Sequence, residues 1–307
     1  MGKYILKRLF QLIITLFVIS LITFFMVRLI PGDPLSILYG IEDNDPAFVE
    51  QKREELGLND PILVQYFRYI SGVLRGNLGT SLRTHKLISA ELLSRYKYTV
   101  VLAVGGTVLS SLIGILFGMV AAANHNKWID SFIMVLSMLA VSTPTFFLAL
   151  ILQIIFSVKL GWLPYGGTKG WIWAVLPITA LGTHAIGMIA RTTRSSMLDV
   201  INQDYIRTSR SKGVSKRVII TSHALKNALI PILTAIGLRF GAFMAGSALV
   251  ETVFNIPGVG RFLIDGVGNR DYPVVQSTIL MLAASFVIIN TLVDLLCAVV
   301  DPRVKYD

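Results

Sequence analysis

The sequence DYIRTSRSKG, from Asp204 to Gly213, is followed after a short interval by HALKNALIP, from His223 to Pro231. Together they form a basic segment between apolar runs, with a glycine at its break. Glycine ends helices readily because it adopts backbone conformations that other residues avoid. The pattern therefore predicts a short helix lying across the end of a helical bundle. Such a helix is suited to be gripped by a separate motor protein, which favours a transporter driven by an external ATPase.

Composition places the chain in a membrane. Hydrophobic residues make up 54% and charged residues 15% of the 307 residues, and the mean hydropathy is +0.68. This leaves too little polar surface to cover a soluble body of this size. The single cysteine, Cys297, lies in an apolar run and has no partner for a disulfide or a metal, so we interpret it as a packing residue.

The formal net charge of +10 is concentrated in one segment. Between Arg191 and Lys226 there are eight basic residues and two acidic ones, an excess of six. Loops on the cytoplasmic side of a membrane protein carry such an excess of lysine and arginine. The charge is explained in this way without DNA or RNA, and we expect no nucleic-acid partner.

Six predominantly apolar runs are long enough to cross a bilayer, which requires about 20 helical residues. They are Leu9–Ile30, Thr99–Ala123, Ser131–Val158, Ile172–Ala190, Ala228–Val250 and Ser277–Val300. The chain is predicted to be an all-α membrane protein with six transmembrane helices, forming a single domain over residues 1–307. The first run follows Lys3, Lys7 and Arg8, and we interpret it as a retained anchor because it is too long for a signal peptide.

The basic clusters also predict the orientation. With six spans, the N-terminal cluster and the segment of about 191–227 fall on one side, which is the cytoplasm, and both termini are predicted to be cytoplasmic. The segment of about 31–98 is then external. Asp45-Pro46 and Asp60-Pro61 each place a capping carboxylate before a proline, which predicts two short helices in it. The second has an apolar stripe and is expected to pack on the bundle or at the lipid surface.

Small residues and prolines predict how the spans pack. Gly114 and Gly118, and also Gly237 and Gly241, have the spacing that lets two helix backbones approach closely. Pro144 and Pro177 lie inside the third and fourth predicted spans and are expected to bend them. A bend can shape a transport cavity or be purely structural, and the sequence leaves both open.

Ionisable residues inside the spans are few. His184, Arg239 and Asp294 are the candidates, and Asp294 lies only about two turns from the cytoplasmic end of its span. An ion-coupled secondary transporter needs carboxylates near the middle of the membrane, so it is kept only as an alternative. A membrane-embedded enzyme is a weaker one, because the sequence contains no G-x-x-x-x-G-K-[ST], no H-E-x-x-H and no Cys/His cluster.

Several stretches resemble one family over nearly the whole chain. They are LIPGDP (29–34), GNLGTS (76–81), TRSSMLDV (193–200), DYIRTSRSKG (204–213), FNIPGVGR (254–261), RDYPVVQ (270–276) and DPR (301–303). The chain resembles the inner-membrane permease subunits of ATP-binding cassette (ABC) importers for dipeptides, oligopeptides and nickel, in particular their B-type dipeptide or glutathione permeases. The general coupling motif of these permeases begins with glutamate and closes with Leu-Pro, whereas here Arg207 and Leu225-Lys226 stand at those positions, as they do in the peptide subfamily.

The resemblance implies the type I importer permease fold, and it implies partners. These are a second homologous permease, two ATP-binding subunits, an extracytoplasmic substrate-binding protein and membrane lipid, in the bacterial cytoplasmic (inner) membrane. This subunit would form a pathway for di- or oligopeptides, or for glutathione, nickel or another small solute. It would bind no cofactor itself, since ATP and Mg²⁺ belong to the ATP-binding subunits. The residues implied for ATPase coupling are Asp204, Tyr205, Arg207, Thr208, Ser209, Arg210, Lys212, Gly213, His223 and Leu225.

The segment Glu251–Gln276 is predicted to be external, and it has two interpretations. Its glycines and prolines are typical of a well-defined connector. The resemblance favours a flap that gates the outer opening or contacts the binding protein. The residues of this second hypothesis are Pro257, Gly258, Gly260, Arg261, Arg270, Asp271 and Tyr272.

Overall fold

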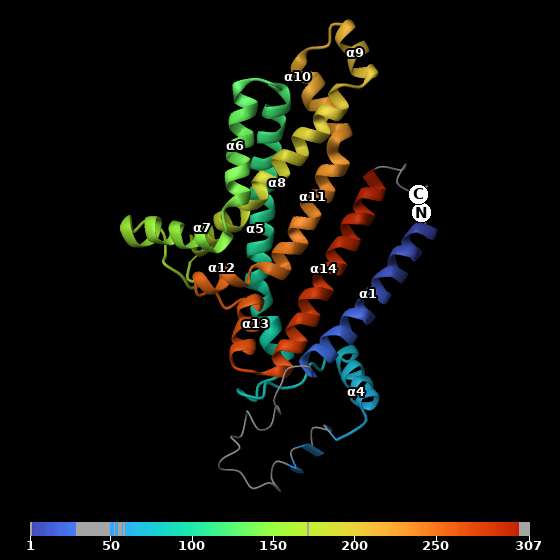
Figure 1. The fold of residues 1–307 in the computed structure, drawn as a ribbon, viewed down its shortest axis with the longest axis vertical. Coiled ribbons are helices and arrows are strands. Elements are labelled where there is room, and N and C mark those ends of the chain that lie inside the picture. Colours follow the sequence, from blue (N-terminus) through green and yellow to red (C-terminus); the bar gives the residue numbers. More distant parts are fainter. Residues whose placement is uncertain are drawn as a thin grey trace.

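The computed structural model describes residues 2–28, 50–51, 53–54, 57, 59–170 and 172–300. Over these ranges the chain is helical, with one isolated β-bridge between Thr80 and Leu87. Figure 1 shows long helices side by side, with short helices at both ends of the bundle. Within the described residues, five helices are long and apolar enough to cross a membrane, or six if one bent pair counts as a single span.

The bundle is centred on α5 (Ile88–Ala123) and α8 (Val175–Ile201). Gly114 and Gly118 of α5 lie against α8, and a Cβ atom on Gly118 would come within 2.6 Å of the Ala190 carbonyl oxygen. The predicted close approach is therefore confirmed for this glycine pair. It brings the two backbones together without a lipid-filled gap, which favours van der Waals packing inside a membrane.

Two of the helices extend well past the predicted spans. The helix α8 continues to Ile201 rather than ending at Ala190. The helix α11 (Leu225–Gly246) is preceded without a break by α10 (Lys216–Val218) and the π-helical turn η3 (Ile219–Ala224). The apolar count stopped at the first charged residues, but a helix continues beyond the membrane wherever its backbone hydrogen bonds are maintained. The connection between α8 and α11 is consequently shorter than the predicted loop of 191–227.

The third predicted span is broken. It consists of α6 (Trp128–Ser142), followed by α7 (Thr145–Leu152) and the π-helical segment η1 (Gln153–Lys159), with an angle of 96° between the two parts. Thr143 is extended and Pro144 precedes the first turn of α7, because proline disfavours a helical conformation in the residue before it. The predicted bend at Pro144 is therefore confirmed, but it is sharp enough to break the helix, and α7 turns sideways from the bundle (Figure 1).

Pro177 has a different effect from the predicted one. It is the third residue of α8, which follows the 3₁₀ turn η2 (Ile172–Ala174). A proline in the first turn of a helix removes an N–H that has no partner within that helix. Pro177 therefore starts the helix rather than bending its interior.

The last helix, α14 (Tyr272–Val300), packs between α11 and α1 (Gly2–Arg28). On α11, Gly237 and Gly241 lie against Val293 and Phe286 of α14, so the second glycine pair also makes a close helix contact. Where α14 packs against α1, Arg8 of α1 forms an ion pair with Asp294 of α14 at 2.8 Å. Asp294 thus has a structural partner, which fits its interpretation as something other than an ion-coupling group.

The short helices lie at the two ends. One end has α9 (Asp204–Ser211) and α10, and the other has α4 (Ile62–Leu74), α12 (Ala248–Val253) and α13 (Val259–Gly268) (Figure 1). The helix predicted after Asp60-Pro61 is confirmed as α4, and its Tyr66 is buried with its hydroxyl 2.8 Å from Ser20 Oγ of α1. The Asp45-Pro46 pair, at which the other short helix was predicted to begin, the LIPGDP stretch and the terminal DPR lie outside the described residues.

Candidate functional site

The helix α9 projects beyond the ends of the neighbouring helices (Figure 1). Of the predicted coupling residues on or next to it, Ser209 is half-buried, and the others are exposed: Asp204, Tyr205, Arg207, Thr208, Arg210, Lys212 and Gly213. Ile206 is fully buried and anchors the helix. The exposed Asp204–Arg207 pair, at 3.9 Å, contributes little because water screens it. Ile206 therefore holds α9 in place, and the rest of the helix presents a polar, basic surface.

Gly213 ends α9 in the conformation that the sequence predicts. Its φ is +79°, its N–H donates to the Arg210 carbonyl at 2.9 Å, and the Val214 N–H donates to the Ser209 carbonyl at 3.2 Å. These two bonds form a Schellman motif, which needs a residue with positive φ at this position. Nothing lies within 4 Å of a Cβ added to Gly213. The constraint at this position is therefore backbone conformation alone, not space.

His223 and Leu225 lie apart from α9 along the chain. They are half-buried in η3 and at the start of α11, within the long helix that begins at Lys216. The structure thus divides the predicted coupling residues into an exposed helix and the first turns of the helix that leaves it. A π-helical turn such as η3 is rare and is often found at functional positions.

An ion pair fastens α8 to α6 close to this end of the bundle. Arg194 of α8 binds both oxygens of Asp130, through Nε to Oδ1 at 2.5 Å and Nη2 to Oδ2 at 2.6 Å. Asp130 Oδ2 also accepts the Asn126 N–H at 3.1 Å and lies 3.4 Å from His125 Nδ1. The side chain of Asp130 is only 4% exposed. Sequence reasoning missed this pair, although an acidic residue directly before a predicted span was a usable signal.

At the opposite end, Glu251 organises the α12–α13 cluster, which we define as α12, α13 and the residues that hold them. The side chain of Glu251 is fully buried. It accepts hydrogen bonds from Ser247 Oγ at 2.6 Å, Thr99 Oγ1 at 2.7 Å and the Arg261 N–H at 2.8 Å. Because the last of these comes from the first turn of α13, the carboxylate joins α12, α5 and α13.

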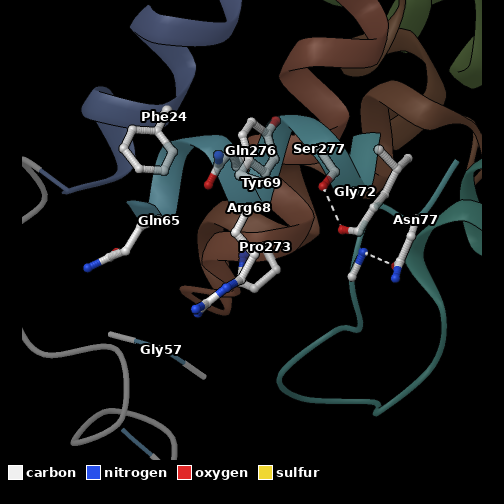
Figure 2. Close-up of a pocket in the computed structure, with 12 residues that line it drawn as sticks. Phe24, Gly57, Gln65, Arg68, Tyr69, Gly72, Asn77, Pro273, Gln276 and Ser277 are labelled. Atoms are coloured by element: carbon white, nitrogen blue, oxygen red, sulfur yellow. Dashed lines mark hydrogen bonds between the residues drawn. The ribbon is translucent and has the colours of Figure 1, made fainter. Parts of the chain in front are cut away.

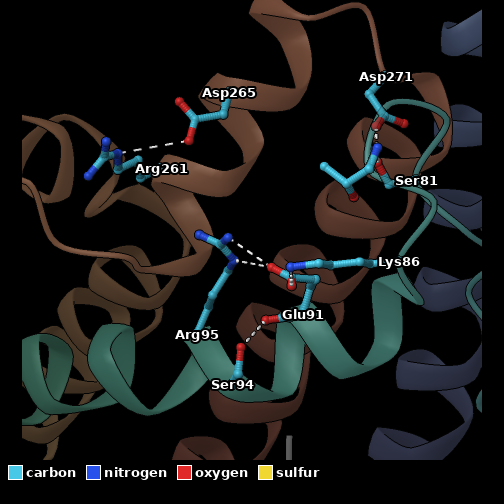
Figure 3. Close-up of polar contacts among 9 residues, drawn as sticks. Ser81, Lys86, Glu91, Ser94, Arg95, Arg261, Asp265 and Asp271 are labelled. Carbon is cyan, nitrogen blue, oxygen red and sulfur yellow. Dashed lines mark hydrogen bonds and ion pairs between the residues drawn. The ribbon is translucent and has the colours of Figure 1, made fainter.

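The glycines of the FNIPGVGR stretch serve this packing. Gly258 and Gly260 are buried, and a Cβ on Gly258 would collide with the Glu251 carboxylate. Pro257 and Arg261 are half-buried, and the Arg261 side chain contacts Asn255 and, at 3.8 Å, Asp265 (Figure 3). Arg95 of α5 lies over the Phe262 ring of α13, 4.5 Å from its centre. In this structure the stretch packs against α5 and α12, which by itself does not decide between the connector and the flap.

Asp271 and its neighbours make a second junction. Asp271 is buried and accepts from Ser81 Oγ at 2.6 Å and from the Leu82 N–H at 3.2 Å, which ties the 76–86 loop to the start of α14 (Figure 3). Tyr272 is also buried. Arg270, in contrast, is exposed and has a φ of +52°. Of the predicted outer-gate residues, Arg270 alone presents an exposed charged side chain.

A pocket of about 300 Å³ lies beside this junction, between α4 and α14. Figure 2 shows Tyr69, Gln276 and Pro273 around it, and the Ser277 hydroxyl that donates to the Leu78 carbonyl at 3.0 Å. Burial raises the pKa of Tyr69 to about 12, so its hydroxyl stays protonated. Among the described residues, no group of three or more His, Cys, Asp or Glu side chains is placed to hold a metal ion.

Comparison with known families decides the class of protein. Residues 114–306 match the family described as "Binding-protein-dependent transport system inner membrane component", and residues 1–103 match its N-terminal companion. The chain belongs to this family. The permease is 42% identical to the glutathione transport system permease protein GsiC of Salmonella paratyphi A and 40% identical to that of Escherichia coli (strain K12). Each alignment spans 306 residues and 100% of both chains.

Solved structures show the same fold at low sequence identity. The MetNI methionine ABC transporter, in inward-facing conformations, matches with a TM-score of 0.59 and 19% identity, covering 68% of the permease and 96% of that chain. An amino acid ABC transporter matches with a TM-score of 0.53 and 16% identity, covering 70% and 94%. The permease therefore has the type I ABC importer permease fold. It is a permease subunit of an ABC importer of the dipeptide, oligopeptide and nickel family, as its motifs predicted.

Proposed function

We propose that the permease forms half of the translocation pathway for a small peptide in a bacterial inner-membrane importer. A second homologous permease forms the other half, two ATP-binding subunits dock at the α9 end, and an extracytoplasmic binding protein delivers cargo at the α12–α13 end. ATP and Mg²⁺ stay with the ATP-binding subunits. The observation that carries the proposal is α9, an exposed basic helix held by Ile206 and ended by Gly213.

The mechanism follows from how α9 is attached. It is joined directly to α8 and, through Gly213 and α10, to α11. A force on α9 therefore acts on two helices that cross the bundle. ATP-driven closure of the motor subunits would rock these helices between inward and outward openings, as in alternating access. This chain needs no catalytic residue for that role, because it transmits force and lines a path.

For the cargo, we favour a peptide of the size of glutathione. Support comes from the two GsiC relatives, which match along the whole chain. Dipeptides, longer peptides and nickel remain alternatives within the same class of importer, since the binding protein sets most of the selectivity. Competition of labelled glutathione uptake by dipeptides and by Ni²⁺, in cells with the complete transporter, decides among them.

The coupling role is tested by Gly213→Val. A valine at positive φ costs on the order of 1 kcal/mol or more, so it should disrupt the Schellman motif at the end of α9 and change the direction of that helix. We expect normal membrane levels, at least a severalfold loss of co-purifying ATP-binding subunits, and a parallel loss of glutathione uptake. The matched control is Gly268→Val, at the end of α13, where an added Cβ also meets nothing within 4 Å and φ is not positive. Full retention of the motor subunits and of uptake in Gly213→Val would refute the coupling role.

The orientation has its own test. We propose that α9 and both termini are cytoplasmic, on the basis of the basic residues at that end. After Cys297→Ala, single cysteines at the exposed positions Thr84 and Ser215 should react differently with an impermeant thiol reagent. In intact cells with a permeable outer membrane, Thr84→Cys should be labelled and Ser215→Cys should be labelled only after lysis. Labelling of both before lysis contradicts this topology.

A further inference from the structure

A basic cavity lies behind α9, at the end of the bundle that carries α9 and α10. Its volume is about 510 Å³. Four of its lining residues have basic side chains, from three separate segments: His125 and Lys127 from the α5–α6 turn, Arg210 from α9 and Lys216 from α10. Its floor is apolar and includes Leu198, Ile201 and Ile219. None of the described residues that line it is acidic.

The positive charge in this cavity is not neutralised from within the described chain. The carboxylate that contacts His125 belongs to Asp130, which already binds Arg194 through both oxygens. Lys216 Nζ donates to the Ala123 carbonyl at 2.7 Å, a neutral partner that leaves its charge in place. Lys127 and Arg210 are exposed. The cavity is thus built to receive an anion whose body is partly apolar.

The depth of the cavity points to the membrane surface. The apolar helix α5 ends at Ala123 and α6 begins at Trp128, so the turn that carries His125 and Lys127 lies where the hydrocarbon region ends. Trp128 is 75% exposed, and exposed tryptophans of membrane proteins concentrate at the level of the lipid headgroups. Figure 1 shows this turn and α10 nearer to the spans than α9 is. Lys127 therefore faces headgroups, while α9 extends farther toward the motor.

We propose that this cavity binds the phosphate of an anionic phospholipid from the cytoplasmic leaflet, with an acyl chain along the apolar floor. Basic pockets between membrane helices on the cytoplasmic side are suited to such headgroups. A lipid phosphate here bridges Lys127 of the α5–α6 turn and Arg210 of the coupling helix, so the leaflet composition affects how α9 is held. This inference needs only the orientation of the chain, and it is independent of the cargo.

The test measures lipid directly. The assembled transporter is purified in mild detergent, titrated with phosphatidylglycerol or phosphatidylcholine, and analysed by native mass spectrometry. We expect one phosphatidylglycerol to bind more tightly than the others, with little competition from phosphatidylcholine. In Lys127→Gln/Arg210→Gln its affinity should fall about tenfold or more, since each basic side chain near an anionic headgroup contributes severalfold. Lys226→Gln removes an exposed charge from the same end outside the cavity, and it should bind as the parent does.

Three outcomes overturn the proposal. The first is that the double variant and Lys226→Gln bind phosphatidylglycerol with equal affinity. The second is that the bound mass is that of inorganic phosphate without acyl chains, which assigns the cavity to a soluble anion. The third is that the double variant loses its ATP-binding subunits while it keeps the lipid, which makes the cavity a protein-docking face. The lipid readout does not depend on uptake, so its failure is distinguishable from failure of the transport function.

Discussion

Asp130→Asn is expected to destabilise the permease by about 2–3 kcal/mol and to reduce uptake on the order of tenfold. Breaking a buried ion pair leaves the remaining charge without compensation, and here that charge is Arg194, which lies in the part of α8 leading to α9. On the coupling role proposed for α9, this pair helps to carry movement of α8 to α6, and its loss is expected to weaken that transmission. The measurements are thermal unfolding of the purified complex and uptake per transporter at equal membrane levels.

The matched control is the other Asp–Arg pair of this end. Asp204→Asn alters the pair in which the Asp204 carboxylate lies 3.9 Å from the Arg207 guanidinium. The Asp204 side chain is 98% exposed. An exposed pair contributes between zero and about 1 kcal/mol, so thermal unfolding should hardly change. Co-purification of ATP-binding subunits with Asp130→Asn separates loss of force transmission from loss of docking. If Asp130→Asn unfolds and transports like the parent, the ion pair does not fasten α8 to α6 in the working transporter.

Glu251→Ala should have an effect of similar size at the α12–α13 end, with a loss of stability on the order of 3 kcal/mol. It leaves the hydroxyls of Thr99 and Ser247 and the Arg261 N–H without their acceptor, and each buried unsatisfied group costs about 1–3 kcal/mol. It also opens a cavity where Gly258 now packs on the carboxylate. We expect lower thermal stability and early proteolytic cleavage within the Asn255–Gly258 turn.

Two further variants test whether the loss of stability comes from the missing hydrogen-bond acceptor and volume at position 251 or from the loss of a negative charge in this region. Glu251→Gln keeps the volume and one acceptor oxygen, so it should lose less stability than Glu251→Ala. Asp265→Asn changes a half-exposed carboxylate on α13 and should be nearly neutral. Equal stability of Glu251→Ala and Asp265→Asn would show that the carboxylate does not hold the α12–α13 cluster.

The sequence predicted those features that depend on nearby residues. Apolar runs located the helices, and Gly213 after a helical run predicted the positive φ that the structure has. The apolar stripe predicted for α4 includes Tyr66, which is buried. In each case the pattern lies within a few residues, and backbone geometry or periodicity connects it directly to structure.

The polar junctions could not be predicted in the same way. Asp130 and Arg194 are 64 residues apart, and Glu251 and Thr99 are 152 apart. Their pairing depends on how the helices cross, which no local pattern specifies. Pro144 shows a related difficulty, because its chemistry predicts a bend but packing around α7 sets the angle at 96°. The same applies to the basic cavity, whose basic residues converge from three segments.

The contact between α1 and α14 joins helices from the two ends of the described chain, and it has a consequence for biosynthesis. During synthesis α1 is made well before α14, which supplies its packing surface and Asp294, the partner of Arg8. Until α14 is made, α1 packs on the short α4 and otherwise faces mainly lipid. Closure of the bundle is therefore a late event, and a ribosome that stops before α14 leaves an apolar helix for quality-control proteases to recognise.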